Sequence, residues 1–290
     1  MCKSLFTPVS RERPVGRYAP SPSGELHLGN LATALAAWED CRRRGGIFIL
    51  RIEDLDTPRL VASAEARMIE DLRWLGIDWD EGPDLGGPAG PYRQSERGGL
   101  YQAALARLAA AGLTYLCTCS RKDLREASAP HGAEPIYPGR CRARDAEAQR
   151  RHPAGAAVRF RVDRAPRIHF VDLRLGPQTC DLDAESGDFI IHRRDGLWAY
   201  QLACAVDDAL MGVTHVWRGE DLLTSTPRQI ALLRALELPV PEYGHLPLVR
   251  DEAGRRMCKR DGSCSLGRLR EAGLSPAQAR AAILDATRDR

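Results

Sequence analysis

The chain has 290 residues, of which 43% are hydrophobic and 28% are charged, and this balance excludes a largely disordered protein. Its 42 basic and 39 acidic residues leave a net charge of +3, an excess too small to indicate nucleic-acid binding by itself. The N-terminus lacks the apolar core of a signal peptide, and no apolar run approaches the roughly 18 residues of a membrane span, so we expect a cytoplasmic protein with no membrane partner.

The first part of the chain alternates strand and helix patterns. VGRYAP (15–20) predicts a short strand, residues 27–46 predict a helix that stops at two glycines, and IFILRIED (47–54) predicts a buried strand. Further helical patterns cover residues 62–75 and 99–111. A strand, helix and strand in this order predict an α/β fold with a parallel sheet.

The pattern weakens up to about residue 167, where prolines at 130, 135, 138 and 153 indicate a small inserted subdomain. The parallel sheet is then expected to resume. Three segments predict strands, namely DFIIHRRDG (188–196), THVWRGED (214–221) and HLPLVRD (245–251). Helices are predicted at 200–210 and 225–238, and a last one after the N-cap residue Ser275.

The segment GRYAPSPSGELHLGN (16–30) suits phosphate chemistry. It leaves a strand and starts a helix near His27, where unpaired N–H groups and a partial positive charge are presented to an anion. The small residues Ser21, Ser23 and Gly24 let a bulky anion approach the backbone. By itself the segment also fits an ordinary turn followed by a histidine cap.

A basic loop, RMCKRDGS (256–263), fits a solvated surface turn when taken alone. Together with HLGN (27–30), however, its MCKRD resembles the paired HIGH and KMSKS signatures of class I aminoacyl-tRNA synthetases. RIEDLDTPR (51–59) and residues 199–229 resemble the glutamyl and glutaminyl branch of that family. Two positions depart from the signatures: Asn30 stands for the last histidine of HIGH, and Cys258 stands for the serine before Lys259.

The resemblance implies a Rossmann-like, HUP-type catalytic domain that activates L-glutamate with ATP. The α-carboxylate attacks the α-phosphate, and the acyl-adenylate is then attacked by a group of the tRNA. Catalysis then needs positioning and neutralisation of phosphate charge, with Mg²⁺ accompanying ATP. The implied catalytic residues are His27 and Lys259, and the implied ATP-binding residues are His27, Gly29, Asn30 and Lys259.

The same resemblance assigns a glutamate pocket, made of Arg17, Tyr18, Ala19, Pro20, Ser21, Glu53, Tyr200 and Arg218. Two guanidinium groups and one carboxylate match the two carboxylates and the ammonium of glutamate. Glutamine leaves one arginine incompletely paired, which costs about 2–5 kcal/mol, or roughly thirtyfold to several thousandfold. The alternative is that Arg17 and Arg218 form structural ion pairs with Glu53 or Asp221.

Nine cysteines without a secretory signal indicate reduced thiols or metal ligands. Cys117, Cys119 and Cys141 are spaced suitably for a tetrahedral Zn²⁺ site, which would be structural and hold one ion per chain. The resemblance implies Tyr137 as the fourth ligand, and His131 is its competitor. Buried free cysteines are the alternative to a metal site.

A full glutamyl-tRNA synthetase carries a C-terminal domain that reads the anticodon, whereas few residues follow Lys259 here. This arrangement resembles the glutamyl-Q tRNA(Asp) synthetases, which attach glutamate to queuosine in the anticodon of tRNA(Asp). A monomer acting on ATP, L-glutamate and tRNA(Asp) bearing queuosine is therefore expected. The alternatives are a short glutamyl-tRNA synthetase that charges tRNA 3′ ends, and a non-catalytic RNA-binding or amino-acid-sensing relative.

The expected domain division combines these patterns. It consists of an N-terminal extension (1–14), the first half of the catalytic domain (15–112), an inserted zinc-binding or acceptor-type subdomain (113–167), the second half of the catalytic domain (168–250), and a KMSKS-like loop with a short helical segment (251–290).

Overall fold

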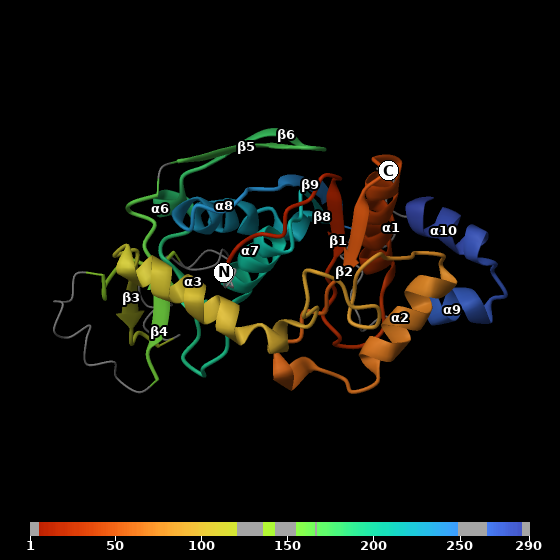
Figure 1. Cartoon of the computed structure of the whole chain (residues 1–290), viewed down its shortest axis with the longest axis horizontal. Coiled ribbons are helices and arrows are strands. Elements are labelled where there is room, and N and C mark those ends of the chain that lie inside the picture. Colours follow the sequence, from red (N-terminus) through yellow and green to blue (C-terminus); the bar gives the residue numbers. More distant parts are fainter. Residues whose placement is uncertain (1–5, 121–135, 143–154, 166, 249–265, 286–290) are drawn as a thin grey trace.

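The computed structural model of the chain describes residues 6–120, 136–142, 155–165, 167–248 and 266–285. Its larger sheet has six strands in the order β2-β1-β8-β9-β5-β6 (Figure 1). Their bounds are Ile47–Leu50 for β2, Val15–Tyr18 for β1, His215–Gly219 for β8, Glu242–Leu246 for β9, Ile168–Asp172 for β5 and Gly176–Cys180 for β6. Neighbours from β2 to β5 pair in parallel, and β6 is an antiparallel edge strand.

Helices cover both faces of this sheet. In Figure 1, α1 (Leu28–Arg43) and α10 (Pro276–Asp285) lie on one side of β1 and β2, and α7 (Tyr200–Leu210) and α8 (Ser225–Ala235) lie on the other. Each side has its own cluster of buried apolar side chains. The predicted α/β class with a Rossmann-like parallel sheet is therefore confirmed.

Local sequence explains the close contact between α1 and β1. A Cβ atom on Gly16 would lie only 2.9 Å from the Cβ of Cys41, so glycine lets the helix approach the strand.

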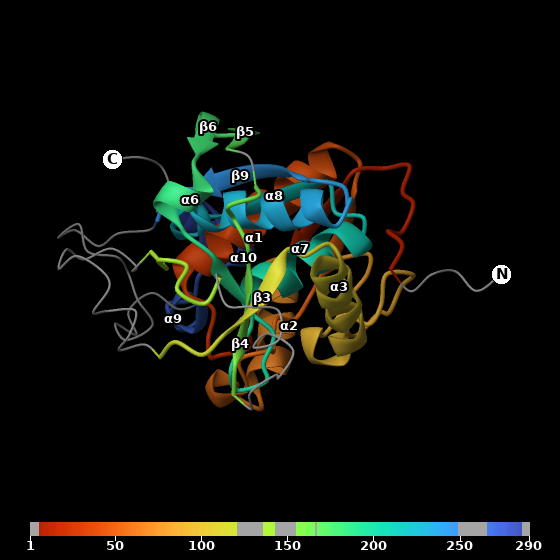
Figure 2. The same ribbon diagram turned by 90° about the vertical axis from the view of Figure 1, so that its left-hand side faces the viewer.

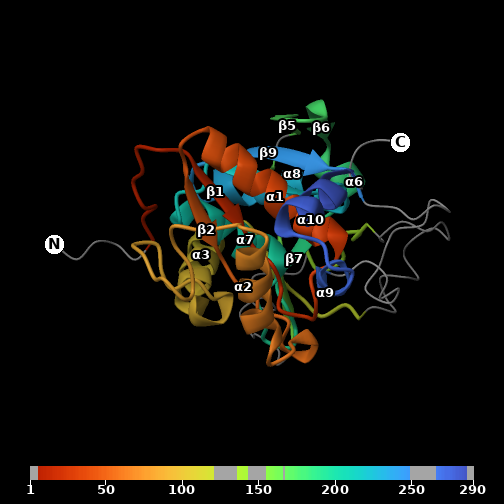
Figure 3. The ribbon, with the colours of Figure 1, turned by 90° about the vertical axis from the view of Figure 1, so that its right-hand side faces the viewer.

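At the other end of the chain, Ser275 caps α10 by accepting the N–H of Gln278 at 3.4 Å, and the Gln278 side chain accepts the N–H of Ser275 at 2.9 Å. Figure 3 shows α10 packed beside α1, together with the short α9 (Leu266–Glu271).

A second sheet of three antiparallel strands lies away from the β5–β6 hairpin, as Figure 2 shows. It is made of β3 (Thr114–Cys117), β4 (Ala157–Phe160) and β7 (Phe189–His192). The segment 188–196 is thus a strand as predicted, but its placement in the resumed parallel sheet is wrong. Its backbone pairs with β4, so the small sheet takes a strand from beyond residue 167. The domain limits stay predictions.

Two further expectations need correction at the far edge of the main sheet. The strand predicted at 245–251 is shifted toward the N-terminus in the described residues, because β9 ends at Leu246 and Pro247 cannot donate a ladder hydrogen bond. Residues 249–251 of that prediction lie outside the described residues. The β5–β6 hairpin has no counterpart among the predicted strands. Its residues alternate between exposed and covered positions, and Val171 is 68% exposed, so it lacks the buried apolar run that marks the central strands.

The remaining helices follow the predicted pattern. The segments expected at 62–75 and 99–111 are α2 (Ala64–Trp74) and α3 (Gly98–Ala110). One-turn segments complete the chain: α6 (Leu182–Glu185) and the 3-10 turns η1 (Thr57–Arg59), η2 (Gln94–Glu96) and η3 (Glu220–Leu222). Among the described residues, no helix combines the length and the apolar character needed to cross a bilayer.

The strand order locates a binding site. The chain moves outward from β1 to β2 in one direction and from β8 to β9 in the other, so the topological switch point lies between β1 and β8. In open α/β sheets ligands bind at this point, outside the carboxyl ends of the strands.

Candidate active site

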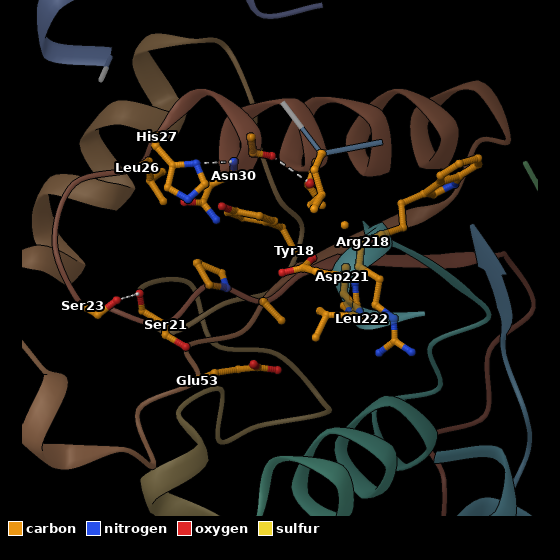
Figure 4. A pocket seen from close by; sticks show the side chains of 18 of the residues that line it. Tyr18, Ser21, Ser23, Leu26, His27, Asn30, Glu53, Arg218, Asp221 and Leu222 are labelled. Carbon is orange, nitrogen blue, oxygen red and sulfur yellow. Dashed lines mark hydrogen bonds between the residues drawn. The ribbon is translucent and has the colours of Figure 1, made fainter. Parts of the chain in front are cut away.

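A cavity of about 550 Å³ opens at the switch point. Every described residue assigned by the resemblance to glutamate or ATP lines it: Arg17, Tyr18, Ala19, Pro20, Ser21, His27, Gly29, Asn30, Glu53, Tyr200 and Arg218. Figure 4 shows His27 and Asn30 on one side, Glu53 on the opposite side and Tyr18 between them. Lys259 and Cys258 lie outside the described residues.

His27 is the N-cap of α1. Its Nδ1 accepts the backbone N–H of Asn30 at 3.3 Å, which places the proton of a neutral ring on Nε2 (Figure 4). The first turn of this helix contains no acidic side chain, so nothing there offsets the positive end of its dipole. The structure thus shows His27 as a cap, and this role is compatible with the prediction that the same helix terminus binds an anion.

Arg17 belongs to a buried ion network. Its Nε donates to Asp208 Oδ1 at 3.2 Å, and Arg51 Nη1 donates to the same oxygen at 2.7 Å. Arg51 Nη2 also donates to Glu53 at 3.1 Å. Arg17 thus has an ion-pair partner, but that partner is Asp208 and neither of the two carboxylates expected in the structural alternative.

The network perturbs the two carboxyl groups in opposite directions. Burial raises the pKa of Glu53, and the opposing charges of Arg51 and Arg17 do not offset this effect. Burial also acts on Asp208, but the charges of Arg51 and Arg17 outweigh it and hold the pKa of Asp208 below its ordinary value. Glu53 is therefore the group in the pocket that gains most from an added cation.

Among the described residues, the hydrogen-bond partners of the Arg218 side chain are all neutral groups. Its Nη1 lies 2.7 Å from Gln229 Oε1 and 3.5 Å from the Tyr200 hydroxyl, and its Nη2 donates to Thr226 Oγ1 at 2.6 Å. Its Nε faces His245 at 3.2 Å. Within the described part of the chain, no carboxylate lies at ion-pair distance from this guanidinium. Arg218 is thus a guanidinium that is only 3% exposed and that no described carboxylate approaches to ion-pair distance, and such a group is chemically suited to bind an anion.

Sequence reasoning missed several residues of the site. Asp208 and Arg51 complete the ion network, and Trp217, Leu222, Pro247 and Leu248 form an apolar wall of the cavity. One signal was available: Asp207 and Asp208 are consecutive acids within an otherwise apolar helix, and both are buried in α7. Buried acids require cationic partners, and the arginine of RIED was one candidate.

The cysteine cluster lies at the small sheet. The sulfur atoms of Cys117, Cys119 and Cys141 lie within 4.8 Å of one another, with 3.6 Å between those of Cys119 and Cys141. The Tyr137 hydroxyl lies 3.5 Å from the sulfur of Cys117 and 3.7 Å from that of Cys119. Its competitor His131 lies outside the described residues.

These distances fit one metal ion. Zn²⁺ with Zn–S bonds of 2.3 Å places neighbouring ligand atoms of a tetrahedron about 3.8 Å apart, and somewhat closer where one of them is oxygen. Arg159 lies over the Tyr137 ring, with 3.8 Å from its central carbon to the ring centre, and places a positive charge beside the phenol. The three thiols can therefore bind a metal, and Tyr137 is positioned to complete the set.

Known proteins resemble nearly the whole chain. Residues 15–284 match the family described as tRNA synthetases class I (E and Q), catalytic domain. A protein named glutamyl-Q tRNA(Asp) synthetase from Symbiobacterium thermophilum is 56% identical over 268 residues, covering 90% of this chain and 82% of that protein. Glutamate–tRNA ligase 2 of Alkalilimnicola ehrlichii is 49% identical, and this chain spans 56% of its length.

A solved structure supports the same conclusion. The crystal structure of a glutamate tRNA ligase from Elizabethkingia meningosepticum, in complex with its amino acid, matches with a TM-score of 0.77 and 32% identity. It covers 87% of this chain, which corresponds to 53% of the ligase. The chain therefore belongs to the class I aminoacyl-tRNA synthetases of the glutamyl and glutaminyl group, and it is a ligase of that type.

Proposed function

We propose that the protein activates L-glutamate with ATP and transfers it to the queuosine base of tRNA(Asp). The observation that carries the activation of glutamate is that Arg218, which no described carboxylate approaches to ion-pair distance, lines the same cavity as the Glu53 carboxylate. A ligand with an ammonium group and more than one carboxylate satisfies both. The names of relatives at 45–56% identity support the same amino acid.

The charged side chains of the cavity bind different charged groups of the amino acid. Glu53, whose pKa is raised by burial, accepts the substrate ammonium, whose positive charge stabilises the buried carboxylate. Arg17 and Arg218 take the two carboxylates, with Arg17 keeping Asp208 as a second partner. Tyr200 lies 3.5 Å from Arg218 and adds a hydroxyl to the same end of the cavity.

ATP fits beside the amino acid at the start of α1. His27, Gly29 and Asn30 present the helix terminus to the phosphates, and the apolar wall of Trp217, Leu222 and Leu248 suits the base. No protein nucleophile is required, so the residues act by positioning the α-carboxylate and neutralising phosphate charge, with Mg²⁺ bound to ATP. Lys259 is proposed to bind the same phosphates.

Zinc is proposed as a structural ion. Cys117, Cys119 and Cys141 would hold it together with the Tyr137 oxygen. When bound, it supplies cross-links within a small region whose own apolar cluster contains few residues. The cluster and the cavity share no residue, so the metal has no part in adenylate formation.

The nature of the acceptor separates this proposal from its closest alternative. Labelled glutamate, ATP and tRNA(Asp) bearing queuosine are incubated with the protein, and the tRNA is cleaved between the anticodon loop and the acceptor stem. We expect the label on the anticodon fragment. Label on the fragment with the terminal adenosine would identify a synthetase that charges 3′ ends.

Two controls complete the test. The same tRNA(Asp) without the queuosine modification should accept no glutamate, and the Arg218→Gln variant should lose labelling of either fragment. A wild-type protein that catalyses no glutamate-dependent exchange of pyrophosphate into ATP would support the non-catalytic alternative. A protein that exchanges normally but labels neither fragment would retain the activation half of the proposal and lose the acceptor half.

A further inference from the structure

A chain of buried hydrogen bonds ends at Arg218. It crosses three neighbouring strands, from Asp172 at the end of β5, through His245 in β9, to Arg218 in β8. Asp172 Oδ2 lies 2.5 Å from His245 Nδ1, and His245 Nε2 lies 3.2 Å from Arg218 Nε. The His245 side chain is 0% exposed, and neither it nor Asp172 lines the cavity.

The direction of these hydrogen bonds is determined from the carboxylate outward. Asp172 Oδ1 accepts the backbone N–H groups of Arg174, Leu175 and His245 at 3.0, 2.9 and 3.3 Å, so that the carboxylate cannot turn. Its other oxygen accepts Nδ1–H of the imidazole. Burial and the charge of Arg218 lower the pKa of His245, so the ring is neutral. Its Nε2 is then an acceptor for Arg218 Nε–H.

We propose that Asp172 and His245 are positioning residues that orient Arg218 for the substrate carboxylate without neutralising its charge. This inference rests on the proposed function, because it concerns the same site. A carboxylate in direct contact would orient a guanidinium equally well, but it would also occupy the charge that the substrate needs. Because the neutral ring of His245 lies between Asp172 and Arg218, Asp172 can fix the orientation of the guanidinium without forming an ion pair with it.

The other contacts of Arg218 fit this role. Thr226 and Gln229 accept from its terminal nitrogens, and the Thr226 hydroxyl lies 3.1 Å from His245 Nε2 as well. The ring of Tyr243 lies 5.1 Å beneath the guanidinium carbon. All of these contacting groups are uncharged, so they fix the guanidinium of Arg218 without forming an ion pair with it. Such a site discriminates a carboxylate from a carboxamide.

The sharpest test is Asp172→Asn, which retains the shape of the side chain. Because the Oδ1 position accepts three backbone N–H groups, the amide oxygen must take that place and the amide nitrogen must face His245. The imidazole is then forced into the other tautomer, and its Nε2–H points at Arg218 Nε–H. Two donors in contact displace the guanidinium, a tautomer effect of the kind known for catalytic triads.

The variant should change substrate binding more than the chemical step. In glutamate-dependent pyrophosphate exchange we expect KM for glutamate to rise roughly 10- to 100-fold, since hydrogen bonds to charged groups contribute about that factor. The preference for glutamate over glutamine should fall by a similar factor, with kcat changed less.

Asp188→Asn is the matched control. Asp188 is as buried as Asp172 and accepts the N–H of Val162 at 2.9 Å, but it does not line the cavity. A similar rise of KM in both variants would overturn the inference.

A second measurement is independent of activity. Selective ¹⁵N labelling of the seven histidines should show His245 protonated at Nδ1 in the wild type and at Nε2 in Asp172→Asn. Protonation at Nε2 in the wild type overturns the inference whether or not the variant folds. If the wild-type protein shows the expected tautomer but no glutamate-dependent exchange, the proposed function fails while the orientation of Arg218 by His245 stands. If the tautomer inverts without any change in KM, the positioning role is wrong.

Discussion

Arg17 and Asp208 form a buried ion pair between residues 191 positions apart, with 3.2 Å between Nε and Oδ1. Their side chains are 5% and 1% exposed. The pair joins β1 to α7, and Arg51 contacts the same carboxylate oxygen at 2.7 Å. One carboxylate therefore pairs with two buried guanidinium groups, so we expect Asp208 to contribute to stability.

Asp208→Asn should destabilise the protein by about 3–5 kcal/mol, because it leaves the buried guanidinium of Arg17 without its ion-pair partner and removes the nearest of the carboxylates that pair with Arg51. Urea denaturation monitored by circular dichroism measures this difference. The pKa of Asp208 is lowered by its partners, so its contribution is present above the ordinary aspartate pKa and is lost as the pH falls through the lower, folded-state value. The free energies of unfolding of the wild type and the variant should therefore become similar in acid.

Asp183→Asn is the control. The Asp183 side chain is 62% exposed in its ion pair with Arg142, so its loss should change the free energy of unfolding by less than about 1 kcal/mol.

Glutamate binding should weaken in mildly acidic solution. The pKa of Glu53 is raised by burial, so this carboxyl group takes up a proton at a higher pH than an ordinary glutamate and then no longer attracts an ammonium. KM for glutamate, measured by pyrophosphate exchange, should rise as the pH falls toward that pKa. Glu53→Gln should have a high KM at every pH and lose this dependence. An unchanged pH profile in the variant would mean that another group is responsible.

Two substitutions at position 27 separate the cap from the chemistry. Asparagine is a good N-cap, so His27→Asn should retain thermal stability, whereas His27→Ala should lose about 1 kcal/mol. Both variants lack the imidazole donor and should lose roughly 10²- to 10³-fold in kcat for adenylate formation. If His27→Asn retains full activity, the histidine is only a cap. Differential scanning calorimetry and pyrophosphate exchange provide the two measurements.

Metal analysis should find about one zinc ion per chain, as expected for a structural site. Cys141→Ser should lower this content, and Cys180→Ser, whose sulfur lies outside the cluster, should leave it unchanged. Tyr137→Phe should weaken zinc binding, while His131→Ala should not. The reverse result would make His131 the fourth ligand. Chelation should loosen the three-stranded sheet before it affects the larger sheet.

Much of the site could be predicted because its residues are close together along the chain. Residues 16–30 form one strand-to-helix connection, so the sequence alone predicts a phosphate-type anion site near His27, and the structure shows that a cavity lies there. The helices were predictable for the same reason, since their apolar period of 3.6 residues is a local property. Strand membership was less predictable: the segment 188–196 is a strand, but backbone pairing with β4 assigns it to the small sheet.

The sequence by itself determined the family signatures, the parallel α/β core, the cluster of cysteines and the types of charged residue available for a dicarboxylic amino acid. Only the tertiary structure decided which charges are compensated. Asp208 pairs with Arg17 and Arg51, whereas Arg218 meets a neutral imidazole held by Asp172. The physical reason is that ion pairing depends on distances of a few ångströms between side chains from strands and helices far apart in the chain, and the strand order that sets those distances has no local signal.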